Sequence, residues 1–143
     1  MSNNPFLKTA IIATLGYFIA GRVPFLHGVL GWIVLIGAPF LYVRWKPSIS
    51  AMTSPLGYSL GMGALIGAIA NEAGTVLTIL FEILAVAIGA GGHTATSGLA
   101  VLGAGVGGAF ALIHLLYGPF VGAVLGLFGG LIAGSMLPKS PSN

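Results

Sequence analysis

The sequence predicts an all-α protein, a polytopic bundle of transmembrane helices. The 143 residues are 57% hydrophobic and only 5% charged, whereas about 25% of the residues in a soluble domain are charged. Apolar runs of helical length alternate with short polar breaks, and backbone groups in lipid must be satisfied within helices or closed barrels. No segment shows the sustained alternation of a barrel strand. Glycine, with 24 residues, is concentrated in the apolar runs, which favours closely packed membrane helices.

The few charged residues exclude several classes of function. Five basic residues against two acidic ones give a net charge of +3, and because they are scattered they form no nucleic-acid footprint. The chain has no cysteine and no aspartate, and its histidines lie in three separate segments without the spacing of a ligand set. We therefore predict no metal, no cofactor and no enzymatic activity. The histidines are His27, His93 and His114.

Residues 1–46 are predicted to form an N-terminal transmembrane hairpin. Its two helices cover 6–21 and 26–42, and Pro24 marks the turn between them because proline disfavours helical geometry in the residue before it. Aromatic and basic side chains follow the second helix directly, as is typical of a membrane–water interface. The polar loop 47–55 then separates this hairpin from the rest.

Residues 56–143 are predicted to form glycine-rich transmembrane helices in two further hairpins. A single helix over 56–91 would be about 50 Å long, well beyond a hydrocarbon core of about 30 Å. We therefore predict tight turns at 71–74 and at 117–119, and about six short helices in total. These spans are short for a bilayer, so four longer, tilted helices are the alternative.

The last apolar segment carries a row of glycines that we expect to pack against another helix. Small residues spaced four apart share one helical face, where a second backbone can approach closely. This glycine zipper consists of Gly122, Gly126, Gly130 and Gly134.

Glu82 is the foremost candidate for a functional residue. It lies near the middle of a predicted span, where an ionisable side chain is costly and is usually tied to a partner or a pathway. Thr75 and Thr78 share its helical face, so we expect the carboxyl to face the bundle interior. There it either pins helix packing or handles protons or cations.

Two residues are expected partners for that carboxyl: His114 in the next span and Arg22 in the first turn. The candidate intramembrane polar site therefore comprises Glu82, Thr78, Thr75 and His114. Glu72 falls in a predicted turn and is expected to be an interfacial residue facing Arg22.

The sequence as a whole favours a multi-pass integral membrane protein that packs against other proteins, oligomerises or serves as a complex subunit. The alternative is a small channel or a proton- or cation-coupled transporter that uses Glu82. Its expected partners are the lipid bilayer and other copies or subunits, with no nucleic acid. Basic residues favour the cytoplasmic side, which predicts a plasma (inner) membrane protein with both termini cytoplasmic. The residues that set this orientation are Lys8, Arg44, Lys46 and Lys139.

Overall fold

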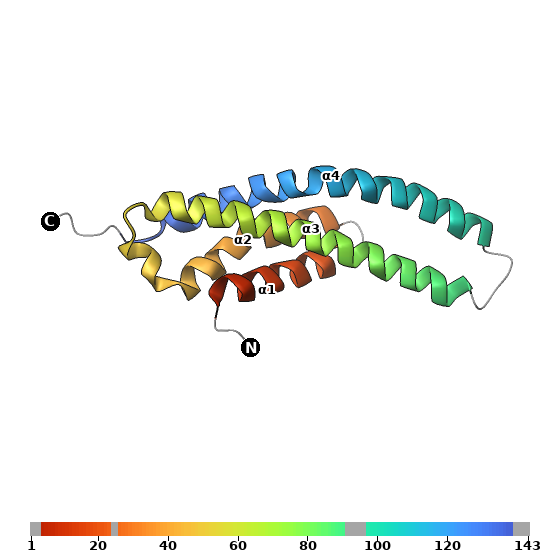
Figure 1. Cartoon of the computed structure of the whole chain (residues 1–143), viewed down its shortest axis with the longest axis horizontal. Coiled ribbons are helices and arrows are strands. Elements are labelled where there is room, and N and C mark those ends of the chain that lie inside the picture. Colours follow the sequence, from red (N-terminus) through yellow and green to blue (C-terminus); the bar gives the residue numbers. More distant parts are fainter. Residues whose placement is uncertain (1–3, 24–25, 91–96, 139–143) are drawn as a thin grey trace.

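The computed structural model describes residues 4–23, 26–90 and 97–138. Within these ranges the chain forms four α-helices and one short 3-10 helix (Figure 1). Asn4 caps the first helix, since its side chain accepts a hydrogen bond from the backbone N–H of Phe6. The elements are α1 (Pro5–Ala20), α2 (His27–Trp45), η1 (Pro47–Ala51), α3 (Pro55–Ala90) and α4 (Ser97–Ser135).

The predicted turns at 71–74 and 117–119 are wrong, because α3 and α4 run through them as continuous helices. The side-chain amide of Asn71, which reads as a turn residue, donates to the carbonyl of Gly118 in α4 at 2.5 Å. Pro119 removes only one helical hydrogen bond, and α4 continues past it. The six short helices are therefore not what the described residues form, and the four-helix alternative fits.

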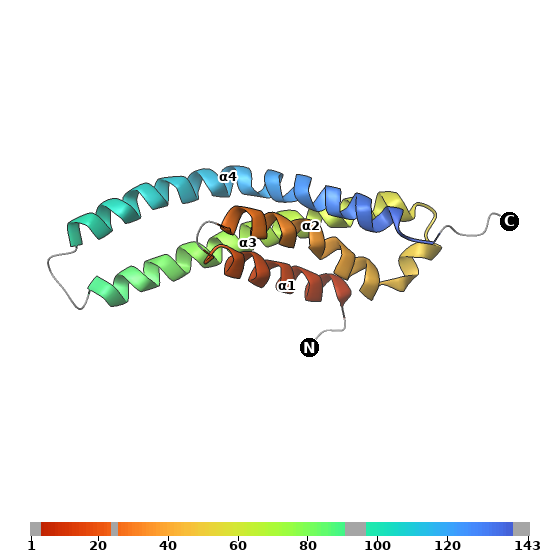
Figure 2. The ribbon, with the colours of Figure 1, turned by 180° about the vertical axis from the view of Figure 1, so that it is seen from behind.

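The helices α1 and α2 lie along one half of a much longer α3–α4 pair (Figures 1 and 2). The 16 residues of α1 and the 36 residues of α3 correspond to about 24 Å and about 54 Å at 1.5 Å per residue. Arg22, just after α1, reaches the carbonyl of Thr78, so the four helices run together to that level. We call this part the body, and we call residues 79–90 and 97–111, which continue beyond it, the arm.

The body has a core of small and branched side chains. The buried residues Ala13, Leu35 and Ile66 come from α1, α2 and α3, and Ile49 of η1 is fully buried beside them. Large apolar side chains point outward instead: Trp32 is 59% exposed and Phe120 is 72% exposed. An apolar exterior around a small-residue core suits a protein surrounded by lipid.

Three helices are long and apolar enough to cross a membrane, over Gly28–Trp45, Pro55–Ala85 and Leu112–Ser135. The fourth, α1, is apolar but shorter, at 16 residues. These helices indicate a membrane-embedded protein.

Several glycines of α3 and α4 lie directly against the other helix. A Cβ added at Gly67 would overlap the backbone carbonyl of Gly122, and one added at Gly63 would overlap that of Gly126. A Cβ added at Gly130 would likewise overlap the backbone carbonyl of Ser59. Gly134 lies against the side chains of Leu56 and Ser59. The four-residue glycine row of α4 is therefore buried along its whole length against α3.

Candidate functional site

Polar side chains meet inside the body at the level where α1 ends. Asn71 is 1% exposed and joins α3 to α4 through its hydrogen bond to Gly118. The hydroxyl of Thr75, one turn further along α3, donates to the carbonyl of Asn71 at 2.8 Å. In lipid a buried polar group is costly unless it is hydrogen-bonded, so these bonds let α3 carry polar residues through an apolar interior.

Tyr17 and His114 complete this level of the body from the two flanking helices. The Tyr17 hydroxyl lies 3.4 Å from Nε2 of His114, while the Tyr17 ring packs on Gly74 and the His114 ring lies beside Gly118. We call Tyr17, Asn71, Glu72, Thr75 and His114 the polar layer. Its hydrogen bonds connect α1 to α4 and α3 to α4, and it contains one carboxyl.

Glu72 supplies that carboxyl, and its predicted place in an interfacial turn is wrong. It lies in the middle of α3 and is partly buried, because the helix does not break at Asn71. Its Oε2 atom is buried and has no hydrogen-bond partner among the described residues. Arg22, its expected neighbour, instead donates to the carbonyl of Thr78 at 3.4 Å.

The expectation that Glu82 faces the interior is also wrong. Glu82 is exposed on the arm, one turn beyond Thr78, and its neighbours Phe81 and Ile83 are exposed as well. At this level α1 has ended, so there is no bundle interior on that side for the carboxyl to enter.

Both expected partners of Glu82 have other contacts in the structure. The Arg22 guanidinium lies 4.3 Å above the ring of Phe81 and 5.0 Å above that of Phe18, a cation–π arrangement that holds it on the aromatic rings. His114 is engaged with Tyr17 in the polar layer.

The candidate site of the sequence is therefore divided in the structure. Thr75 and His114 belong to the polar layer, whereas Thr78 bonds its own helix, donating to the carbonyl of Gly74 at 3.0 Å. Glu82 is separated from them on the arm. Within the described ranges, no three histidine or glutamate side chains come close enough to hold a metal ion.

A second polar cluster lies at the opposite end of the body, where α2 gives way to η1. Lys46 donates to the hydroxyls of Tyr58 at 2.5 Å and Tyr42 at 3.3 Å, and these two hydroxyls lie 2.7 Å from each other. The hydrogen bond that Lys46 donates to the Tyr58 hydroxyl is the main reason that the pKa of Lys46 is raised above its usual value. Lys46 is therefore charged at neutral pH. We call Tyr42, Lys46 and Tyr58 the tyrosine–lysine cluster.

Sequence reasoning missed Asn71, Tyr17 and Tyr58 as members of polar clusters. An asparagine within an apolar run was a usable signal for Asn71, since such a residue needs a partner in lipid. The aromatic and basic residues at 42–46 did indicate an interface, but nothing local points to Tyr58, which lies on another helix. Against known proteins, no family model matches this chain, and comparison with curated proteins and with solved structures finds no match either.

Proposed function

We propose that this chain is a multi-pass structural protein of the membrane, which packs through glycine faces and works as a homo-oligomer or as a subunit of a membrane complex. The observation that supports the proposal is the backbone approach of α3 and α4 at Gly63, Gly67, Gly122 and Gly126. Close backbone contact at small residues is how membrane helices associate where lipid removes the hydrophobic driving force between them. A rigid helix pair of this kind is suited to assembly.

The arm supports the assembly part of the proposal. Every residue from Leu80 to Ala85 is exposed, and an apolar helix of this kind is normally covered by lipid or by other helices. The 31-residue span Pro55–Ala85, at about 46 Å, would need a tilt of about 50° to fit a core of about 30 Å, beyond the usual range of about 0–40°. A helix of another chain, packed along the arm, would cover the part of this span that the hydrocarbon core does not.

A small channel or a proton- or cation-coupled transporter is the second candidate. The buried Oε2 of Glu72, which has no hydrogen-bond partner among the described residues, favours it, because an unsatisfied carboxyl within a membrane bundle is typical of an ion or proton pathway. The Glu82 side chain is exposed on the surface of a single chain. A pathway that uses Glu82 would therefore run between neighbouring copies of the protein.

Flux measurements in reconstituted vesicles separate the two functions. For a structural protein, we expect no proton or cation flux above that of protein-free vesicles at acidic, neutral or alkaline pH. Flux in the wild type would contradict the structural proposal. Loss of that flux in Glu72→Gln but not Glu82→Gln would place the pathway inside the body, and the reverse result would place it between chains.

The same proposal predicts the orientation of the chain. The start of α1, the loop around η1 and the end of α4 lie at one end of the body (Figure 1), and Lys8, Arg44 and Lys46 are at that end as well. Basic residues favour the cytoplasm, so reporters fused at Ser50 and Asn143 should both be cytoplasmic. Reporters on opposite sides would contradict an even number of crossings.

A further inference from the structure

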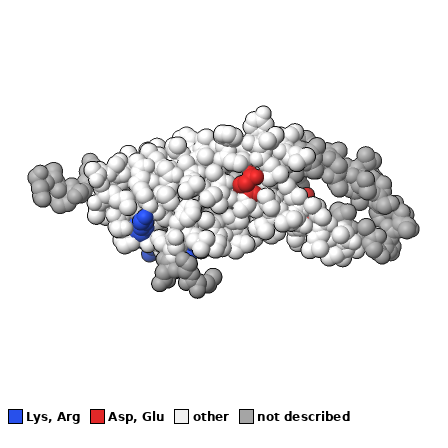
Figure 3. Space-filling view, viewed as in Figure 1, with Lys and Arg blue, Asp and Glu red and all other residues white. Residues whose placement is uncertain are grey.

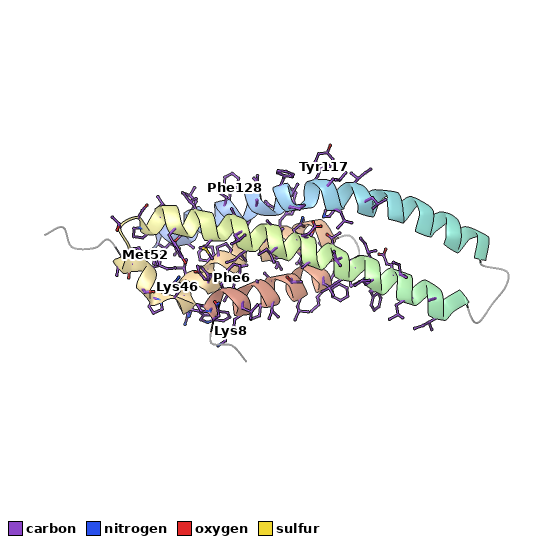
Figure 4. The ribbon with its side chains drawn as sticks, viewed as in Figure 1. Phe6, Lys8, Lys46, Met52, Tyr117 and Phe128 are labelled. Atoms are coloured by element: carbon purple, nitrogen blue, oxygen red, sulfur yellow. The ribbon has the colours of Figure 1, made fainter. Side chains whose placement is uncertain are left out.

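The end of the body that holds η1 carries basic side chains from two helices. Lys8 of α1 and Arg44 of α2 are exposed, and Lys46 is partly buried in the tyrosine–lysine cluster. The ring of Phe6 packs edge-on against that of Tyr42 at 6.4 Å, which brings the start of α1 beside the end of α2. Figure 4 shows Lys8 and Lys46 at this end, close to Phe6.

No acidic side chain of the described residues shares this end. The two glutamates lie further along α3, and the nearer, Glu72, is about 25 Å beyond the start of that helix at 1.5 Å per residue. In Figure 3 the basic atoms in view lie toward one end, while the acidic atoms lie near the middle and further toward the other end. The charged side chains of the described residues at this end are therefore all positive.

The tyrosine–lysine cluster has more hydrogen-bond donors than the described residues around it use. An ammonium group has three N–H donors, and Lys46 uses two of them on Tyr42 and Tyr58. The two hydroxyls share one hydrogen bond between them, which leaves one O–H hydrogen unused. One N–H and one O–H thus remain for an external acceptor, and an anionic oxygen satisfies both.

The cluster is also fixed in place before any ligand arrives. The Lys46 ammonium lies 4.7 Å from the centroid of the Tyr58 ring, so packing as well as hydrogen bonding restricts a side chain that is otherwise flexible. Lys46 follows the candidate span Gly28–Trp45 directly, and the next span begins at Pro55. This position corresponds to the headgroup level of a bilayer.

We propose that this end of the body is a binding site for the phosphate of an anionic phospholipid, with Lys46 and Tyr58 as hydrogen-bond donors and Lys8 and Arg44 adding charge. A net negative headgroup is favoured over a zwitterionic one because the protein supplies only positive charge here. The site does not depend on glycine packing or on transport, so it can fail while the proposed function holds.

Binding of defined lipids to the full chain in an uncharged detergent tests the site. We expect phosphatidylglycerol to raise the Tm of the wild type by several degrees and to bind at least about tenfold more tightly than phosphatidylcholine. Both lipids carry the phosphate, but only phosphatidylcholine adds a positive group that the basic side chains repel, and each basic side chain contributes about 1 kcal/mol to binding of an anionic headgroup. Lys46→Gln should abolish this preference. Tyr58→Phe, which keeps every charge, should weaken it by a smaller factor, and Lys46→Arg should retain most of it.

Arg22→Gln is the matched control, since it removes a positive charge at the other end of the body and should leave the preference unchanged. Equal binding of the two lipids by the wild type, or an unchanged preference in Lys46→Gln, would overturn the site. An equal loss in Arg22→Gln would mean that net charge alone is responsible. Stabilisation by inorganic phosphate as strong as that by phosphatidylglycerol would assign the site to free phosphate instead of lipid. If Lys46→Gln does not fold, the comparison of Tyr58→Phe with the wild type decides, and no difference between them would overturn the role of the cluster.

Discussion

Gly126→Leu should lower the free energy of unfolding by about 3 kcal/mol or more, at the upper end of the range for overpacked cores. The reason is that any Cβ at this position would overlap the backbone carbonyl of Gly63, and a backbone cannot rotate away as the end of a flexible side chain can. The α3–α4 pair would have to separate over several residues. Thermal unfolding in detergent measures the effect.

Leu127→Ile is the matched control for that variant. Leu127 is the next residue in α4 and is 42% exposed, so this change of shape should cost well under about 1 kcal/mol. A Gly126→Leu protein as stable as the control would mean that the glycine face does not hold α3 and α4 together, and the structural proposal would lose its main support.

Asn71→Ala should be the most damaging change among the polar residues, with an expected loss of about 2 kcal/mol from the broken interhelical hydrogen bond and the space left behind. Asn71 is buried, and its amide bonds the Gly118 carbonyl across two helices. Unfolding in detergent and the near-UV signal of the aromatic side chains would report the loss.

Ser59→Ala serves as the control for Asn71→Ala. Ser59 is equally buried on α3, but its hydroxyl donates to the carbonyl of Pro55 in its own helix, which already belongs to the helical ladder. Its removal should therefore be nearly neutral. Equal losses in the two variants would show that polarity as such, and not the link between α3 and α4, determines the stability of this region.

The helical membrane class could be predicted from composition and from the length of the apolar runs, because both are properties of the chain alone. Whether Asn71 ends a helix could not, because the answer depends on the Gly118 carbonyl, which another helix presents. Whether Pro119 ends a helix could not be predicted either, because its missing N–H is tolerated inside a long helix when other helices pack around it.

The direction of Glu82 was mispredicted for a related reason. Thr75 and Thr78 suggested a polar face that turns inward, but both hydroxyls are satisfied by carbonyls of α3 itself. A threonine that bonds its own backbone says nothing about what its face meets. Glu82 is exposed because α1 ends before it along the bundle. The periodicity of the α3 sequence carries no information about the length of α1.

The connectivity of α3 and α4 has a consequence for the order of assembly. The chain passes from α3 to α4 at the far end of the arm, whereas Gly63 and Gly126 meet in the body, at the opposite end of the pair (Figure 1). The entropic cost of closing a loop grows with its length, so the contact between these glycines is expected to form after the short-range contact of α1 with α2. On the proposal that the chain crosses the membrane several times, insertion of the helices and the later docking of α4 are separate events, and a chain blocked before docking would remain in the bilayer with its helices formed and its glycine faces apart.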